Sequence, residues 1–314
     1  MDGAKTLFDG KAPFVTHEQL SDFYYRMPND VTIALLADRG AHNDAAARVA
    51  AQVREQHPDL AIHLGDIYYA GQEDETRQAL SLCPLAHNGV VPPRTSIALN
   101  GNHEMFSGGK YCFGTLLHTF GQDASYFGLY NDYWQILAFD SAYIDHRPLS
   151  PDDDTDARLH EQWAWLVDKM DNNRLPKILL CHHQPVSAFT LDHDAGATLR
   201  ADFQKFLAAA ERPVFGWFFG HAHRCTIYED DGRVPYLARL IGHGCIPHTP
   251  PAAGSQHDPG CIPFRATNTR TLNGRHAVCG YALLRFDDRT IGIQYLDEDG
   301  QQFIAENWIA PLPD

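Results

Sequence analysis

The sequence lacks an excess of positive charge. Forty acidic side chains stand against 25 lysines and arginines, which leaves a formal net charge of −15 with histidine counted as neutral. Proteins that bind nucleic acid through bulk charge need clustered lysine and arginine to neutralise phosphates, so this composition argues against that class. The same acidity disfavours docking on an anionic membrane surface. We therefore expect neither nucleic acid nor a membrane as a partner.

Long apolar runs and targeting signals are also missing. No stretch of about 18 apolar residues occurs, so we expect no membrane-spanning helix. The first residues, MDGAKTLFDGKAPF, contain neither a basic region nor an apolar core and do not resemble a signal peptide. The seven cysteines are spread singly, without a C-x-x-C pair, which favours reduced thiols over a disulfide framework. Together these absences predict a cytoplasmic protein.

The chain does have a core-forming composition and an unusual amount of histidine. Hydrophobic residues make up 44% of the chain and charged residues 21%, which excludes wholesale disorder. Eighteen of the 314 residues are histidine, more than twice the usual share of about one in 45. Because neutral imidazole is the commonest metal ligand among side chains, the positions of these histidines are informative.

Apolar runs alternate with helical patterns through the first third of the chain. Residues 31–37, 60–64 and 95–99 have the pattern of short buried strands, and helical spacing occurs over 43–56 and 73–82. This alternation is typical of a parallel sheet with crossover helices.

The rest of the chain predicts more strands. Residues 125–140 have the pattern of a hairpin, 177–181 and 214–220 that of buried strands, and the chain from residue 224 onward that of antiparallel strands. We expect two stacked sheets with helices outside them. Residues 1–30 would form an N-terminal arm, and residues 31–314 a single domain.

Five of the predicted strands are followed at once by side chains that can bind a metal. These are Asp38, Asp66 with Tyr69, Asn102 with His103, the pair His182-His183, and His221 with His223. Functional groups in α/β sheets gather beyond the carboxyl ends of strands, so we expect these side chains in one small volume. Unpaired, such a cluster is costly to desolvate, and cations remove that cost. Mixed nitrogen and oxygen donors suit Fe, Zn or Mn better than Ca.

These residues lie in strings that resemble a known family. ADRG, GDIYY, GNHE, CHHQP and GHAH, between residues 37 and 223, resemble the five signature blocks of the calcineurin-like metallophosphoesterases. The first block has the D-x-G form in place of the commoner D-x-H, and Tyr69 follows Asp66 by three residues. Both features resemble the purple acid phosphatase branch, in which the tyrosine ligates ferric iron. The resemblance implies an α/β (α+β) fold, a four-layer αββα sandwich of two mixed β-sheets flanked by helices.

The resemblance also implies a binuclear metal centre. The first metal would be held by Asp38, Asp66, Tyr69 and His223, and the second by Asp66, Asn102, His221 and one of the two adjacent histidines. The register of the preceding strand favours His182 for that last position, whereas the spacing in purple acid phosphatases favours His183; we choose His182. The expected cofactors are two metal ions, Fe with Fe, Zn or Mn.

The two expected catalytic residues are Asp66 and His103. Asp66 has two carboxylate oxygens and can bridge two metals, which in such centres lie roughly 3.5–4 Å apart. His103 would not be a ligand; it would contact the substrate phosphate or the leaving group, where an imidazole suits the role of a general acid.

Two further residues are candidates for binding substrate. Arg39 lies beside a metal ligand and would contact phosphate, or it is an exposed charge at a strand end. By its position, His193 resembles a second substrate-facing histidine of the plant purple acid phosphatases, with a solvated loop histidine as the alternative.

We expect a binuclear metal-dependent phosphoester hydrolase that acts on a small-molecule phosphate ester, in the first place a phosphomonoesterase. A phosphodiesterase that cleaves cyclic nucleotides or other diesters is the alternative, because both activities use the same metal core. A non-catalytic scaffold that binds proteins is the third hypothesis. Such scaffolds normally lack ligands, whereas every expected ligand position is filled here. The sequence predicts no particular oligomeric state.

Overall fold

The structure is a computed structural model of the 314-residue chain. It describes residues 10–83, 95–143, 157–190, 214–246, 248–250, 255–272 and 274–312. His193 lies outside these ranges. None of the described helices is both long and apolar enough to cross a bilayer.

One large sheet combines the first three predicted strands with the last three strands of the chain. Its order is β16-β15-β14-β2-β3-β4. Its members are β2 (Asp30–Leu36), β3 (Leu60–His63), β4 (Thr95–Ala98), β14 (Gly280–Asp287), β15 (Thr290–Asp297) and β16 (Gln302–Ile309). β2, β3 and β4 are parallel, as the alternation of strands and helices predicts, whereas β14 pairs antiparallel with β2.

The second large sheet has eight strands in the order β1-β5-β6-β7-β8-β10-β9-β11. They are β1 (Tyr24–Arg26), β5 (Phe127–Tyr130), β6 (Gln135–Ala138), β7 (Lys177–Cys181), β8 (Val214–Phe219), β9 (Cys225–Tyr228), β10 (Leu237–Ile241) and β11 (Phe264–Thr267). β5 and β6 form the predicted antiparallel hairpin, and β6, β7 and β8 run parallel. A separate pair, β12 (Thr271–Leu272) and β13 (His276–Ala277), is antiparallel. The predicted N-terminal arm contributes β1, and the division into an arm and one domain stays a prediction.

The described helices are of very different lengths. They are α2 (Asp44–Glu55), α3 (Glu73–Ser81), α4 (Asn102–Met105), α5 (Leu117–Phe120) and α6 (Ala157–Asp171), with a π-helical turn over Cys112–Leu116. α2 begins where the sequence predicts, because the side chain of Asn43 accepts a hydrogen bond from the backbone N–H of Ala46 at 3.0 Å.

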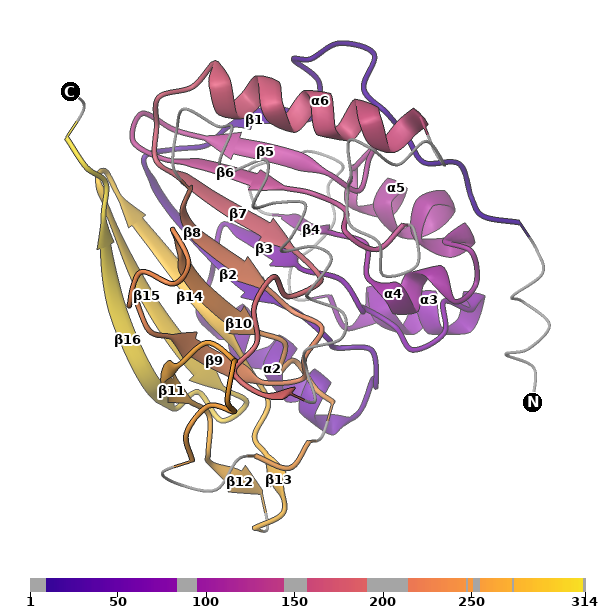
Figure 1. The fold of residues 1–314 in the computed structure, drawn as a ribbon. Helices are drawn as coiled ribbons and strands as arrows, with labels where there is room; N and C mark the ends of the chain where they lie inside the picture. Colours follow the sequence, from indigo (N-terminus) through magenta and orange to yellow (C-terminus); the bar gives the residue numbers. More distant parts are fainter. Residues whose placement is uncertain are drawn as a thin grey trace.

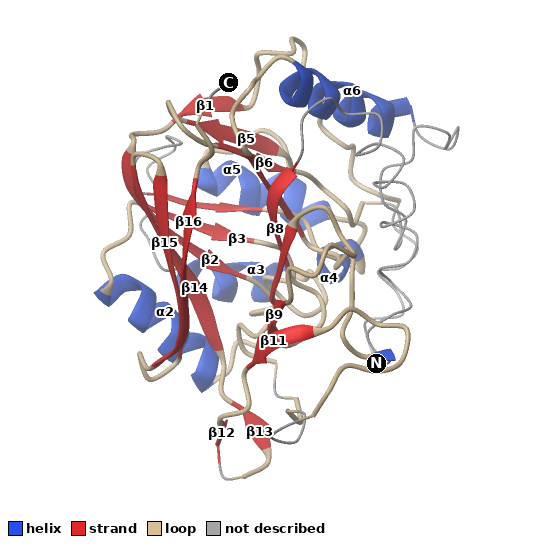
Figure 2. Cartoon of the chain, turned by 60° about the vertical axis from the view of Figure 1, so that its left-hand side comes forward, coloured by secondary structure: helices blue, strands red, loops and turns tan. Residues whose placement is uncertain are grey.

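The two sheets face each other, and helices cover their outer faces. Along β2, Ile33 and Leu35 belong to the core between the sheets, whereas Ala34 and Leu36 pack with Val49 and other apolar residues of α2. α6 packs on the opposite side of the molecule, where it shares a core with the outer face of β7 and β8. Figure 1 shows α6 beside β1, β5 and β6 of the eight-stranded sheet, and Figure 2 shows α2 beside β14. The predicted αββα order of layers is confirmed.

Candidate metal centre

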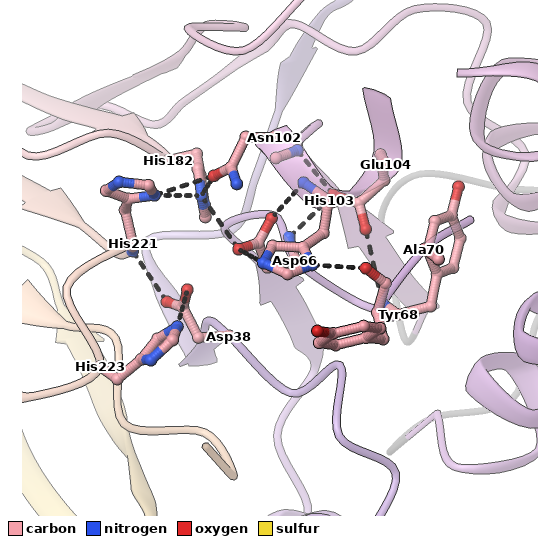
Figure 3. Close-up of polar contacts among 12 residues, drawn as sticks. Asp38, Asp66, Tyr68, Ala70, Asn102, His103, Glu104, His182, His221 and His223 are labelled. Atoms are coloured by element: carbon pink, nitrogen blue, oxygen red, sulfur yellow. Dashed lines mark hydrogen bonds and ion pairs between the residues drawn. The ribbon is translucent and has the colours of Figure 1, made fainter. Parts of the chain in front are cut away.

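The loops that follow β2, β3, β4, β7 and β8 meet at one end of the two facing sheets. Hydrogen bonds between neighbouring segments continue past the strand ends, from Asp38 N to Gly65 O at 3.1 Å and from Gly220 N to His182 O at 2.9 Å. Figure 3 shows the side chains carried by these loops turned toward one another. The structure therefore brings together residues that are up to 185 positions apart along the chain, from Asp38 to His223.

One group of side chains surrounds the amide oxygen of Asn102. This oxygen lies 2.9 Å from Nε2 of His182 and 2.8 Å from Nδ1 of His221, and the two imidazole nitrogens are 3.2 Å apart. Nδ1 of His182 donates to the carbonyl oxygen of Leu64 at 2.9 Å, so its Nε2 is the nitrogen that faces the group. Three of the four residues expected to hold the second metal are thus in mutual contact.

A second group contains Asp38 and His223. Oδ2 of Asp38 accepts a hydrogen bond from the backbone N–H of His221 at 2.9 Å, and its Oδ1 lies 3.8 Å from Nε2 of His223. That Oδ1 atom is buried and has no hydrogen-bond partner. A buried carboxylate oxygen left without a donor is the kind of atom that a cation satisfies.

Asp66 lies between the two groups. Its Oδ2 atom is 3.4 Å from Nε2 of His182, and ligand atoms of Asp38, Asp66 and His182 all lie within 4.8 Å of one another. Its Oδ1 atom accepts the backbone N–H of His103 at 2.9 Å. A side chain at Gly101 would collide with both the backbone nitrogen and the carboxylate of Asp66, so glycine is required there.

The geometry bears on which of the two adjacent histidines, His182 or His183, would bind the metal. Two clusters among the described residues could hold a metal, and His182 belongs to both: one with Asp38 and Asp66, and one with His183 and His221. Nδ1 of His183 lies 3.1 Å from the hydroxyl of Ser141. His182 as the ligand stays a prediction, and its contact with Asp66 and Asn102 favours it.

The site concentrates buried negative charge. Burial and the neighbouring Asp66 carboxylate raise the pKa of Asp38 well above its usual value. Burial also acts to raise the pKa of Asp66, but the charges and hydrogen bonds of His182 and His103 outweigh it and lower that pKa. Burial acts to lower the pKa of His182, and the carboxylates of Asp66, Asp38 and Glu104 raise it to about 9. His182 thus lies among three buried carboxyl groups, an arrangement that additional cations stabilise.

Glu104 is a residue whose role the sequence interpretation missed. It is fully buried, and its carboxylate accepts the backbone N–H groups of Asp66 and Ile67 at 2.8 Å and of Gly101 at 2.6 Å. Burial and the Asp66 charge raise the pKa of Glu104 to about 7. The spacing from Gly101 to Glu104, a helix N-cap and the third helical residue, is the signal that could have revealed it. Glu104 therefore holds the Asp66 and Asn102 loops together.

His103 is at the edge of the centre. Its Nδ1 donates to the carbonyl oxygen of Tyr69, and its Nε2 lies 3.7 Å from Oδ2 of Asp66. Tyr69 is 61% exposed, and its ring centroid lies 5.3 Å from that of His103. The structure thus places Tyr69 beside the expected general acid, while its ligation of a metal stays a prediction.

Arg39 does not lie where the sequence interpretation placed it. Its guanidinium is buried, donates to the carbonyl oxygen of Leu82 and lines a small interior cavity with His63 and Cys83. Burial lowers its pKa. None of the metal-ligand candidates lines this cavity. Both expectations for Arg39, a phosphate contact and an exposed charge, are therefore corrected: the side chain turns into the interior.

The donor set fits a pair of transition metals. Two carboxylates, one amide oxygen and three imidazoles form a mixed nitrogen and oxygen set of the kind that binds Fe, Zn or Mn. The fold and this cluster together form a site that can hold two metal ions at one end of an αββα sandwich.

The comparisons with known proteins name the family. The calcineurin-like phosphoesterase model matches residues 29–225, which is more than half of the chain, and the chain belongs to this family. It is thus by class a phosphoric ester hydrolase. No curated protein matches the sequence closely enough to count as a relative.

Solved structures share the fold at low sequence identity. GAP50, the anchor in the inner membrane complex of Plasmodium, has a TM-score of 0.63 and 11% identity over 90% of each chain. The purple acid phosphatase PPD1 of yellow lupin has a TM-score of 0.61 and 14% identity over 90% of this chain. This chain matches 54% of the lupin chain, so it spans about half of that protein. PhoD has a TM-score of 0.54 and 9% identity, over 95% of this chain and 69% of its own.

Proposed function

We propose that this chain is a binuclear metal-dependent phosphomonoesterase of the purple acid phosphatase-like branch. The observation that carries the proposal is the position of Asp66 between two contacting groups, one around Asn102 and one around Asp38. The first metal would be held by Asp38, Asp66, Tyr69 and His223, and the second by Asp66, Asn102, His182 and His221. The D-x-G form of the first block and the presence of Tyr69 favour iron in the first position.

The bound metals would supply Lewis acidity, which activates water and neutralises charge on the phosphoryl group. The protein's own residues orient the reacting groups. Because Nδ1 of His103 donates to the Tyr69 carbonyl, Nε2 is the atom that can carry a second proton toward the centre. From this position His103 would hand that proton to the departing oxygen of the ester.

The similarity in fold to GAP50 does not by itself favour a non-catalytic scaffold. GAP50 is described as an anchor, and its 11% identity shows a shared fold only. Apart from Tyr69, each candidate ligand of this chain contacts at least one other, which supports a working centre. A cytoplasmic location is part of the proposal, and its support is that the cysteines of the described residues are free thiols, as in a reducing compartment.

The experiment compares hydrolysis of p-nitrophenyl phosphate and of bis(p-nitrophenyl) phosphate by metal-loaded protein, together with its metal content. We expect the monoester to be preferred. Asp66→Ala and Asn102→Ala should each lower kcat by about 10²–10³-fold or more, because each removes charge stabilisation at the reacting centre. Both should also lower the metal content.

Asp74→Ala is the matched control, because its carboxylate is 95% exposed on α3 and outside the centre. It should keep both activity and metal. If both site variants retain full activity, the binuclear mechanism is wrong. If the diester is preferred, the enzyme is a phosphodiesterase.

A further inference from the structure

Two aromatic side chains stand exposed beside the candidate centre. Seven large hydrophobic side chains of the described residues are clearly exposed, and only Tyr69 and Phe106 among them are aromatic. Phe106 is 42% exposed. The five others are aliphatic and lie elsewhere in the chain, as scattered single residues do on most surfaces. Two exposed aromatic rings at one place are therefore an unusual feature of this surface.

Both rings contact His103. The centroid of the Phe106 ring lies 4.6 Å from that of the His103 ring, at an interplanar angle of 48°. The centroid of the Tyr69 ring lies 5.3 Å from that of the His103 ring, at an interplanar angle of 51°. The backbone N–H of His103 donates a hydrogen bond to Asp66, so His103 lies at the edge of the candidate centre. The exposed rings of Tyr69 and Phe106 lie next to the His103 ring, so the three rings extend from the centre to solvent. We name these three residues the aromatic row.

The short helix α4 explains the position of Phe106. His103 is the second residue of this helix, and Phe106 is its C-cap, with its backbone N–H donating to the carbonyl oxygen of His103 at 3.3 Å. Residues three apart lie on the same side of a helical turn, so Phe106 is directed to the same side as His103. The loop that supplies the general acid thus also supplies an apolar ring.

We infer that Phe106 is a specificity-determining residue that stacks on an aromatic leaving group of the substrate. The inference rests on the proposed function, in which His103 faces the departing oxygen of the ester. The group attached to that oxygen must then lie beside the aromatic row. A flat aromatic leaving group, such as an aryl ring or a nucleobase, can stack there, whereas a saturated one loses the stacking contribution.

The probes are two non-hydrolysable ligands of equal carbon number, phenylphosphonate and cyclohexylphosphonate. Binding of each to the metal-loaded protein is measured by titration calorimetry. The wild-type chain should bind phenylphosphonate more tightly. Phe106→Leu keeps apolar bulk but removes the π-system, so the ratio of the two affinities should fall by about two- to tenfold. Phe106→Ala should lower this ratio too and also weaken cyclohexylphosphonate.

The same comparison is made with the kcat/KM values for phenyl phosphate and cyclohexyl phosphate. Taking each variant relative to wild type cancels the intrinsic difference in leaving-group reactivity. Leu312→Ala, a substitution of an exposed leucine near the C-terminus, is the control and should leave both ratios unchanged.

An unchanged affinity ratio in both Phe106 variants would overturn the inference. An equal weakening of both phosphonates by Phe106→Leu would also overturn it, because that result indicates a structural role for the ring. A protein that binds phenylphosphonate through Phe106 but hydrolyses neither ester would contradict the proposed function and leave the subsite standing.

Discussion

At the scale of single residues, the candidate centre is built from strained backbone. Asp38, Asp66 and His221 have φ values of 57°, 57° and 70°, in the left-handed region that non-glycine residues rarely occupy. Each such conformation costs roughly 1–2 kcal/mol and persists only where its surroundings enforce it. Such strain is concentrated at functional sites, and here three ligand candidates carry it.

The variant Glu104→Gln tests whether hydrogen bonds to Glu104 maintain the strained backbone of Asp66. Each oxygen of the Glu104 carboxylate accepts backbone N–H groups, Oε2 from Asp66 and Gly101 and Oε1 from Ile67. Glutamine has one accepting oxygen, and its NH₂ group would face backbone donors. We expect a loss of about 2–3 kcal/mol in the free energy of unfolding, since a buried donor is left unsatisfied, and weaker metal retention. Urea unfolding and elemental analysis measure the two effects.

The control for this prediction is Glu73→Gln on the exposed surface of α3. It should change stability by less than about 0.5 kcal/mol, as surface substitutions usually do. Equal stabilities of the Glu104 and Glu73 variants would show that the carboxylate does not hold the loops.

At the scale of elements, the two sheets are joined by interlocking aromatic side chains. Trp308 on β16 is buried, with its ring 5.3 Å from that of Phe218 and 5.6 Å from that of Phe215. Between these two residues of β8 lies Gly216, where any side chain would collide with the indole of Trp308. Large and small residues thus interdigitate across the sandwich, as sheet packing requires.

Trp308→Ala should therefore destabilise the fold without altering the chemistry. We expect a loss of about 3–5 kcal/mol in the free energy of unfolding, the usual cost of deleting a buried indole. The kcat of the folded fraction should stay within about twofold, because Trp308 has no contact with the candidate ligands. Denaturant unfolding and kinetics below the transition measure both.

Ile309→Ala, at the next position and exposed, is the matched control and should be nearly neutral. If Trp308→Ala loses more activity than its fraction of unfolded protein explains, Trp308 affects the chemistry as well as the packing, and the prediction is wrong.

At the scale of the whole molecule, the centre links metal binding to folding. Asp38, Asp66 and Glu104 are all buried, so the folded chain holds three carboxyl groups close together, and burial and the Asp66 charge raise the pKa of Asp38 and of Glu104. The unfolded chain separates these groups. Metals that bind the folded chain must therefore stabilise it as a whole.

Metal loading should raise the melting temperature. At 100 to 1,000 times the dissociation constant, the stabilisation is about 2.7–4.1 kcal/mol, and a chain of 314 residues gains about 1.5 °C for each kcal/mol. Scanning calorimetry with a chelator and with excess metal measures the difference. Asp66→Ala should lose most of the increase. Identical melting temperatures with and without metal in the wild-type protein would contradict the link.

Much of the fold and of the candidate site could be predicted from the sequence. The strands at 31–37 and 60–64, the Asn43 cap and the order of the signature strings depend on local periodicity and spacing, which are visible in sequence. The strand at Tyr24–Arg26 was not predicted, because its three residues have no periodicity and its pairing with β5 involves residues about 100 positions away.

The sequence by itself determined which side chains occur at the ends of the strands, because that information is local and the parallel topology gathers strand ends at one edge. Only the tertiary structure decided where each side chain points. Arg39 turns into the interior, and Glu104 joins the Asp66 loop to its own. Such directions depend on partners from distant segments, whose packing and hydrogen bonds select one rotamer among several that the local sequence allows equally.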